Sequence, residues 1–295
     1  MDDFYVSQSR FSDPGPHADW LDAAPRSVAA LREAASELVF HYWAHGGITE
    51  HGFPAARHAE ITLRYATDMW ARLRELDPAA PPGRPRPPLN RIVGCCRDFT
   101  LLFVSMARHH GIPARARVGF ASYLMPGWYL DHVVAEVRAD DGWHLVEPQL
   151  STGFRDPVDD VAFDLLDVPR DRFVTAPDAW TAARAGDLDP ARLVVSPDLD
   201  VPFLRGIPYA WHNLVLDLAA LNKHEMLQWD TWGALDASVS LPPATLARAD
   251  ELAALAATAD VEQLRAAFDA DDVRVPPVIR TVTPPEQHLA EVVLR

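Results

Sequence analysis

The chain has 295 residues, a hydrophobic content of 48% and a formal net charge of −15 at pH 7. A chain of this length can bury a full hydrophobic core, and the negative charge argues against nucleic acid or an anionic membrane as a partner. Its two cysteines are adjacent and cannot form a useful structural bridge, which favours a reduced, cytoplasmic setting. We expect neither a signal peptide nor a membrane-spanning segment, because no basic start leads into an apolar run and no apolar stretch is long enough.

The N-terminal part of the chain is expected to form an arm and two helices that lead into a connector. Proline and glycine interrupt residues 1–24, which predicts an irregular arm. Apolar residues recur three and four positions apart in residues 27–43 and 59–76, which predicts two helices with one buried face each. Residues 77–90 contain six prolines and are interpreted as a stiff connector.

Three histidines lie near the end of the first predicted helix. His41 and His45 are four residues apart and His51 is nearby, a spacing that a metal site could use. Such a spacing is common by chance, and no third ligand is well placed. We therefore interpret these histidines as a polar patch, and we expect no metal ion and no cofactor.

A short glycine-led segment places two thiols at the start of a predicted helix. Gly94 precedes Cys95 and Cys96, and apolar residues then recur at helical spacing up to Gly111, where a proline-containing turn ends the helix. The N–H groups and the dipole at the start of a helix favour an anion, so Cys96 is the candidate nucleophile. Cys95 is interpreted as a small buried neighbour, and the role of reactive thiol is its alternative.

Two predicted strands after this helix offer a base and a carboxylate. Residues 131–137 and 143–148 alternate between apolar and polar, which predicts a hairpin with a turn between them. Folding the hairpin about the Ala139–Asp140 junction puts His132 directly opposite Glu147, with their Cβ atoms roughly 5 Å apart. A carboxylate in that position would fix the tautomer of the imidazole and stabilise its protonated form.

Polar and aromatic residues surround these three candidates in the sequence. Asp98 is expected to pair with Arg97 or to cap the backbone. Glu136 shares a strand face with His132, and it either extends a polar network or is a solvated charge. Residues 115–123 predict a further strand, and the loop that follows carries aromatic side chains that either contact substrate or cover the core. The candidates for substrate binding are Tyr123, Trp128, Tyr129 and Asp131.

The C-terminal half alternates between irregular and helical patterns. Residues 151–200 are acidic and rich in proline, and they predict irregular wrapping. Residues 203–233 contain a long apolar helix face, and residues 244–270 predict two short helices. The tail from Val273 is interrupted by proline and is expected to form an edge strand or an arm. The single lysine, Lys223, is interpreted as part of a polar cluster, with a substrate contact as the alternative.

The segment from Gly94 to Gln149 resembles the transglutaminase-like superfamily of papain-like thiol enzymes. The resemblance is carried by Gly94-Cys95-Cys96-Arg97-Asp98-Phe99, Gly111-Ile112-Pro113-Ala114-Arg115, Asp131-His132 and Trp143 to Pro148. It implies an α+β fold in which the helix that bears the nucleophile packs on a small antiparallel sheet. Residues 1–90 would form the arm, helices and connector, residues 91–170 the catalytic core, and residues 171–295 a mainly helical extension packed on that core.

In this family a Gly-x-Cys thiol is the nucleophile, a histidine is the base and an aspartate completes the triad. The resemblance therefore implies Cys96, His132 and Glu147 as catalytic residues, with glutamate where the family usually has aspartate. It implies an acyl-enzyme that passes an acyl group from an amide, peptide or thioester donor to an amine or to water. The alternatives are a non-catalytic module that binds a peptide or protein in the same groove, and a zinc site, which adjacent cysteines fit poorly.

Overall fold

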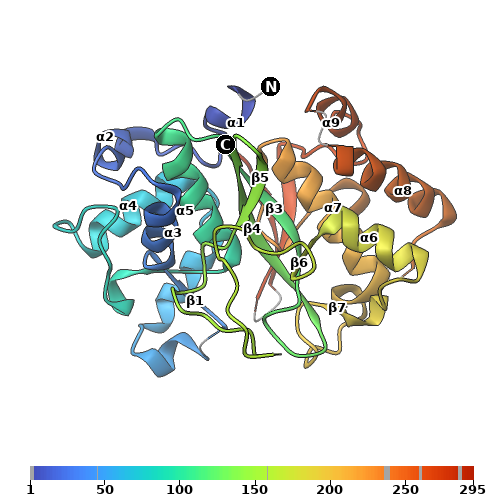
Figure 1. Cartoon of the computed structure of the whole chain (residues 1–295), viewed down its shortest axis with the longest axis horizontal. Helices are drawn as coiled ribbons and strands as arrows, with labels where there is room; N and C mark the ends of the chain where they lie inside the picture. Colours follow the sequence, from blue (N-terminus) through green and yellow to red (C-terminus); the bar gives the residue numbers. More distant parts are fainter. Residues whose placement is uncertain (1–2, 45, 158, 236–239, 259–260, 285–287) are drawn as a thin grey trace. The chain divides into compact units, whose positions relative to one another are not determined.

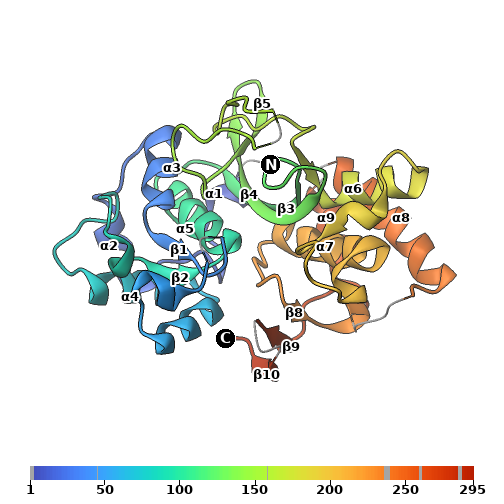
Figure 2. The ribbon, with the colours of Figure 1, turned by 90° about the horizontal axis from the view of Figure 1, so that it is seen from below.

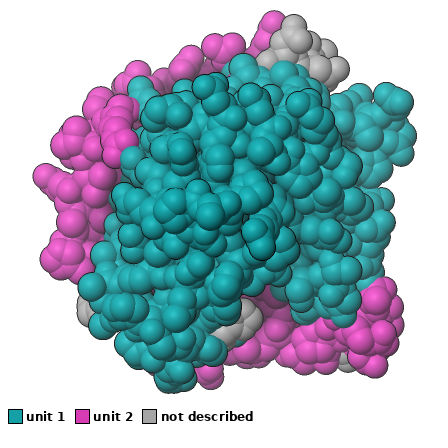
Figure 3. Space-filling view, turned by 90° about the vertical axis from the view of Figure 1, so that its left-hand side faces the viewer, with its two compact units in different colours: residues 1–116, 134–154, 163–168 teal, residues 117–133, 155–162, 169–295 magenta. Residues whose placement is uncertain are grey.

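The computed structural model describes residues 3–44, 46–157, 159–235, 240–258, 261–284 and 288–295. Helices make up 42% of the structure and strands 18%, which confirms the predicted α+β class. The chain divides into two compact units that alternate along the sequence (Figure 3). Unit 1 comprises residues 1–116, 134–154 and 163–168, and unit 2 comprises residues 117–133, 155–162 and 169–295. The expected division of the sequence into residues 1–90, 91–170 and 171–295 stays a prediction.

The elements follow the chain in an irregular alternation of helix and strand (Figure 1). The α-helices are α1 (Asp3–Val6), α2 (Ala18–Leu21), α3 (Val28–Ser36), α4 (Ala66–Leu76), α5 (Cys96–His109), α6 (Ala176–Ala185), α7 (Gly206–Leu221), α8 (Pro243–Thr258) and α9 (Val261–Phe268). The strands are β1 (Val39–His41), β2 (Ile92–Gly94), β3 (Ala114–Ala121), β4 (Tyr129–Ala139), β5 (Gly142–Val146), β6 (Phe173–Thr175), β7 (Leu193–Val194), β8 (Asp230–Thr231), β9 (Val278–Thr283) and β10 (His288–Val293).

The largest sheet has the strand order β5-β4-β3-β6, and β7 joins it in parallel with β4. Strands β4 and β5 form an antiparallel hairpin in which Ala139 pairs with Gly142, and β6 pairs antiparallel with the end of β3. Every residue of β3 is buried, so both faces of this strand are covered. The curled antiparallel sheet that the predicted core requires is therefore present.

Unit 1 is built around helix α5, whose residues 96–108 are all buried. Helix α3 packs along α5 in both ribbon views (Figures 1 and 2), and α4 also contacts α5. Strands β1 and β2 form a parallel pair in which Val39 lies beside Ile92 and His41 beside Gly94. Because β2 ends at Gly94, just before Cys95 and the start of α5, this pair holds the strand that leads to the two thiols.

Unit 2 is mainly helical, and its centre is α7. Helices α6 and α8 both pack against α7 (Figure 2), and the rings of Trp180 on α6 and Trp211 on α7 lie with centroids 6.3 Å apart. The expected long apolar face of residues 203–233 thus forms the core of this unit. A separate antiparallel sheet of order β10-β9-β8 ends the chain, which accounts for the strand expected in the tail.

The prediction for residues 27–43 is wrong in its second half. Helix α3 ends at Ser36, and Val39 begins β1. Backbone pairing with β2 holds these residues extended, although their apolar spacing continues that of the helix. The helix predicted over residues 59–76 begins at Ala66, and most of its expected first part is a 3-10 helix, Ala55–Thr62.

The irregular wrapping predicted for residues 151–200 is wrong for the part that forms β6 and α6. Pro177 lies in the first turn of α6, where its missing N–H costs no hydrogen bond. Ala179, Trp180 and Ala183 bury one face of this helix. The two helices expected in residues 244–270 are α8 and α9, but their expected junction at residues 259–260 lies outside the described residues.

Candidate active site

Helix α5 begins at Cys96, which therefore lies in the first turn of the helix, as predicted. The strand β2, which was not predicted, ends at Gly94. Cys95 occupies the position before the helix, and its N–H donates to the Oδ2 atom of Asp98 at 2.8 Å. A Cβ atom on Gly94 would lie 2.5 Å from that same oxygen, so only glycine leaves room for this contact. At the other end, Gly111 has a φ of +76°, which ends the helix as expected.

An ion pair between neighbouring residues fixes the start of α5. The Nη1 atom of Arg97 donates to Oδ1 of Asp98 at 3.0 Å, and both side chains are only 2% exposed. The same guanidinium donates to the backbone carbonyls of Leu63 at 3.2 Å and Arg64 at 2.5 Å. Asp98 therefore pairs with Arg97 and caps the backbone at once, which confirms both expectations. Burial raises the pKa of Asp98, and the nearby charge of Arg97 opposes this shift without cancelling it.

The two cysteines are buried and reduced, with 3% of Cys95 and 6% of Cys96 exposed. A hydrogen bond with Cys96 and burial raise the pKa of the Cys95 thiol well above its usual value, and the negative charge of Asp98 acts in the same direction. A thiol with a raised pKa is a poor nucleophile, because the thiolate is the reactive form. This direction agrees with the interpretation of Cys95 as a buried neighbour, and the role of Cys96 as the nucleophile stays a prediction.

His132 lies on β4 in unit 2 and is 1% exposed. The rings of Tyr123 and Phe173 meet it edge to face, at centroid distances of 6.1 and 6.4 Å. Aromatic walls of this kind hold an imidazole in one orientation and keep bulk water away from it. Of the residues expected to bind substrate, Tyr123 is thus a buried neighbour of the candidate base.

The other three substrate-binding candidates lie on or beside the start of β4 in unit 2. Trp128 and Tyr129 are half-buried, and the Arg192 guanidinium lies 5.0 Å from the centroid of the Tyr129 ring. Asp131 is also half-buried, and its Oδ2 atom accepts a hydrogen bond from Gln228 at 3.4 Å. Their proposed contact with substrate stays a prediction.

Glu147 lies directly after β5 in unit 1 and is fully buried. Its N–H donates to the carbonyl of Leu165 at 2.8 Å, and its Oε1 atom accepts the N–H of Gln149 at 2.9 Å. Arg32 is the nearby positive charge: burial lowers the pKa of its guanidinium, while Glu33 and Glu147 act to raise it. Arg32 also donates to Thr152 at 2.7 Å, which ties α3 to the segment after Glu147.

The predicted direct pairing of His132 with Glu147 is wrong. Ala135 pairs with Val146 and Ala139 with Gly142, so continuing this register places Glu147 opposite Val134. Both Asp140 and Asp141 lie in the turn, which shifts the register by two residues from the predicted fold point. The association of Cys96, His132 and Glu147 in one site stays a prediction.

Glu136 belongs to a buried polar contact that sequence reasoning described only in part. It is 1% exposed and accepts a hydrogen bond from Nε of Arg115 at 2.8 Å, so it is not a solvated charge. The Arg115 guanidinium also lies 4.1 Å from the ring centroid of Trp143 and 5.1 Å from that of Tyr5. The alternation of β3 gave no sign of this arginine, because an arginine at such a position usually faces solvent.

Of the two histidines that were considered as a metal pair, only His41 lies in the described part of the chain, and it accepts backbone hydrogen bonds. The Nδ1 atom of His41 accepts the N–H groups of Trp43 at 3.1 Å and Ala44 at 3.0 Å. His45 lies outside the described residues. In the described part of the chain no three His, Cys, Asp or Glu side chains are grouped so that they could hold a metal ion.

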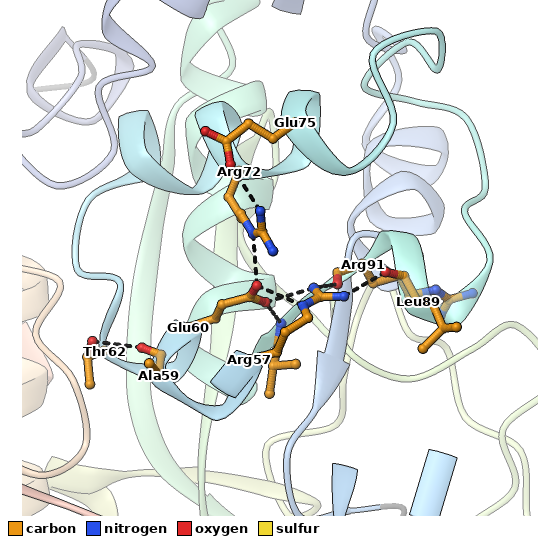
Figure 4. Close-up of polar contacts among 9 residues, drawn as sticks. Arg57, Ala59, Glu60, Thr62, Arg72, Glu75, Leu89 and Arg91 are labelled. Atoms are coloured by element: carbon orange, nitrogen blue, oxygen red, sulfur yellow. Dashed lines mark hydrogen bonds and ion pairs between the residues drawn. The ribbon is translucent and has the colours of Figure 1, made fainter. Parts of the chain in front are cut away.

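A half-buried glutamate that the sequence analysis missed supports the strand leading to Cys96 (Figure 4). Glu60 accepts hydrogen bonds from Arg57, Arg72 and the N–H of Val93, each at 2.8 Å. Arg57 donates in turn to the backbone carbonyls of Leu89 at 2.6 Å and Arg91 at 2.5 Å. These contacts, the Glu60 cluster, connect the proline-rich connector to β2.

The Glu60 cluster predicts a specific loss of stability in acid. Burial acts to raise the pKa of Glu60, but hydrogen bonds from Arg57, Val93 and Arg72 outweigh it, so the pKa lies below its ordinary value of 4.5. Because the carboxyl of Glu60 has a higher pKa in the unfolded chain, the unfolded chain binds a proton there more readily than the folded protein. The stability that the Glu60 carboxylate contributes is therefore complete well above pH 4.5 and is lost as the pH falls through its lower pKa in the folded state. We expect the difference in unfolding free energy between the parent and Glu60→Gln to be largest near neutral pH.

Urea unfolding of both proteins at a series of pH values from 7 to about 3 would measure this difference. Glu75→Gln is the matched control, because Glu75 also pairs with Arg72 but its side chain is 66% exposed. A gap between the parent and Glu60→Gln that stays constant down to the lowest pH would contradict the assignment.

A comparison with protein families finds a match over the part of the chain that contains the candidate catalytic residues. Residues 54–148 match the family model of the transglutaminase-like superfamily, a range that includes Cys96, His132 and Glu147. This match confirms the resemblance found in the sequence, and it covers about a third of the chain. No curated protein matches the chain.

One solved structure similar to the chain is "a Putative Cysteine Protease from Cytophaga hutchinsonii". The similarity has 16% sequence identity and a TM-score of 0.35, and it covers 58% of this chain. The chain spans 44% of the length of that protein. Among the described residues, no helix is both long and apolar enough to cross a membrane.

Proposed function

We propose that this chain is a transglutaminase-like thiol enzyme that forms an acyl-enzyme on Cys96. The observation that carries the proposal is the position of Cys96 in the first turn of α5, at a helix start held by the buried Arg97–Asp98 pair. The positive end of the helix dipole stabilises a thiolate there. The match of the surrounding residues to the transglutaminase-like superfamily supports the same chemistry.

In the proposed reaction, Sγ of Cys96 attacks the carbonyl carbon of an amide or thioester donor. His132 takes the thiol proton and delivers it to the leaving amine or thiol as the tetrahedral intermediate collapses to the acyl-enzyme. Glu147 is proposed to orient His132, and the backbone N–H of Cys96 to donate to the oxyanion. An amine or water then attacks the thioester with His132 as its base, which releases the product and returns the proton to Cys96.

The first test is the rate of single alkylation of the protein against pH, read by intact mass. We expect the parent to react rapidly well below pH ~8.5, the pKa of a free thiol, and Cys95→Ala to keep this behaviour. Cys96→Ala should lose the fast reaction. His132→Ala should slow it at neutral pH by about ten- to a hundredfold and move its pH dependence toward that of an ordinary thiol.

The opposite result would favour the non-catalytic alternative. If Cys96 reacts no faster than an ordinary thiol and His132→Ala changes nothing, the chain is better explained as a module that binds a peptide or protein. If the fast reaction is present, the mass of the protein incubated with amide and thioester donors, with and without a primary amine, would distinguish transfer from hydrolysis.

A further inference from the structure

The segment that follows β1 lies against the residue that precedes the two cysteines. In the parallel β1–β2 pair, His41 is registered with Gly94. The next residue, Tyr42, donates its N–H to the carbonyl of Gly94 at 2.9 Å. Since parallel strands end on the same edge, the chain leaves β1 beside the point where β2 turns into α5 and Cys96. Both strands and α5 belong to unit 1.

Four ring-bearing side chains gather at this point. The rings of His41 and Tyr42 stack at 5.4 Å with an interplanar angle of 11°. The Tyr42 ring also meets Trp43 at 6.2 Å and His58 at 5.8 Å, both in edge geometry. Aromatic contacts at these distances are attractive, and none of the four residues is buried, so each keeps part of its surface exposed.

The side chain of Trp43 is exposed to solvent. It is 43% exposed, and it is the aromatic residue among the large hydrophobic side chains that are exposed in the described part of the chain. Its backbone is nevertheless held in place, because its N–H donates to Nδ1 of His41 at 3.1 Å. A ring presented on a fixed backbone loses little conformational freedom when it binds a partner.

We propose that His41, Tyr42, Trp43 and His58 form an aromatic subsite that binds an aromatic side chain of the acyl donor next to Cys96. This inference rests on the proposed function and deepens it by naming a substrate class. None of the four side chains carries a permanent charge, so the subsite favours an uncharged planar group over a carboxylate or an amine. The hydrogen bond from Tyr42 to Gly94 keeps the subsite next to the segment that carries the thiols.

Two alkylating reagents test the subsite without knowledge of the natural substrate. Iodoacetamide and N-benzyl iodoacetamide carry the same reactive group, and only the second offers an aromatic ring. We expect the parent to react with the benzyl reagent at Cys96 faster than with iodoacetamide, when both rates are divided by those of a free thiol. Trp43→Ala should lower this preference by about three- to tenfold. Trp43→Phe should restore part of it.

Leu89→Ala is the matched control, because Leu89 is a large hydrophobic residue of unit 1 with a similar exposure of 46%. It should leave the preference unchanged. If Cys96 reacts rapidly with both reagents and Trp43→Ala keeps the parent's preference, the subsite is wrong and the proposed function stands. If Cys96 is slow with both reagents in the parent, the proposed function fails and the subsite fails with it.

Discussion

Replacement of Asp98 by alanine is expected to lower the free energy of unfolding by about 3–5 kcal/mol, the usual cost of removing one partner of a buried ion pair. The substitution leaves the Arg97 guanidinium buried without its carboxylate, and Arg97 is 2% exposed. It also removes the acceptor of the Cys95 N–H at the start of α5. Both losses fall on the residues that position Cys96, so we expect the alkylation of Cys96 to lose its unusual pH dependence as well.

Urea unfolding followed by circular dichroism would measure the change for Asp98→Ala, Asp98→Asn and a matched control. Asp98→Asn keeps an oxygen acceptor and should cost less than alanine. The control is Asp22→Ala in the same unit, because Asp22 also pairs with a basic side chain, His109 at 2.8 Å, but is 68% exposed. It should cost less than about 1 kcal/mol. If Asp98→Ala costs no more than Asp22→Ala, the pair does not anchor the helix.

The raised pKa of Asp98 indicates why such a pair is present. Burial is the largest influence on this carboxyl, and Arg97 only partly compensates for it. An ion pair of this kind adds less net stability than apolar side chains of equal volume would. Its contribution is to fix positions: the two oxygens of Asp98 accept hydrogen bonds from the Cys95 N–H and from Arg97, at the point of the chain where the candidate thiol must be placed accurately. We therefore interpret the pair as a positioning device for Cys96.

Features that depend on neighbouring residues were predictable from the sequence. The helix at Cys96 follows from apolar residues at helical spacing and from a glycine at each end, all within one continuous segment. Strands β3, β4 and β5 follow from their local patterns in the same way. The placement of Cys96 at a helix start and of His132 on a strand was thus available without a structure, whereas Glu147, predicted within a strand, lies just after β5.

Features that depend on distant partners were not predictable. Val39 continues the apolar spacing of α3, and only its pairing with Ile92 makes it part of a strand. The hairpin register depended on whether one or two aspartates form the turn, and the local pattern does not decide this. Glu60 is an unremarkable acid in the sequence, and its importance comes from contacts with Arg72 and Val93 in the folded chain.

In unit 2, we expect Asp217→Ala to lower the free energy of unfolding by about 3–5 kcal/mol. Asp217 lies in α7 and is fully buried. Its carboxylate accepts two hydrogen bonds from Arg117, at 3.1 and 2.9 Å, and one from the N–H of Val118 at 2.7 Å. Three donors on one buried carboxylate join the central helix of the unit to β3, so its removal leaves a charge and a backbone N–H without their acceptor.

A double-mutant cycle with Arg117→Ala separates the pair from the rest of this contact. If the two charges depend on each other, the double variant will be more stable than the sum of the single losses predicts, by about 1–3 kcal/mol, since each single variant leaves one charge buried without its partner. Asp271→Ala is the matched control, because Asp271 pairs with Arg274 in the same unit at 2.6 Å but is 92% exposed, and it should cost less than about 1 kcal/mol. Strict additivity of the two buried substitutions would show that Asp217 acts through Val118 alone, and the role of Arg117 in joining α7 to β3 would then be wrong.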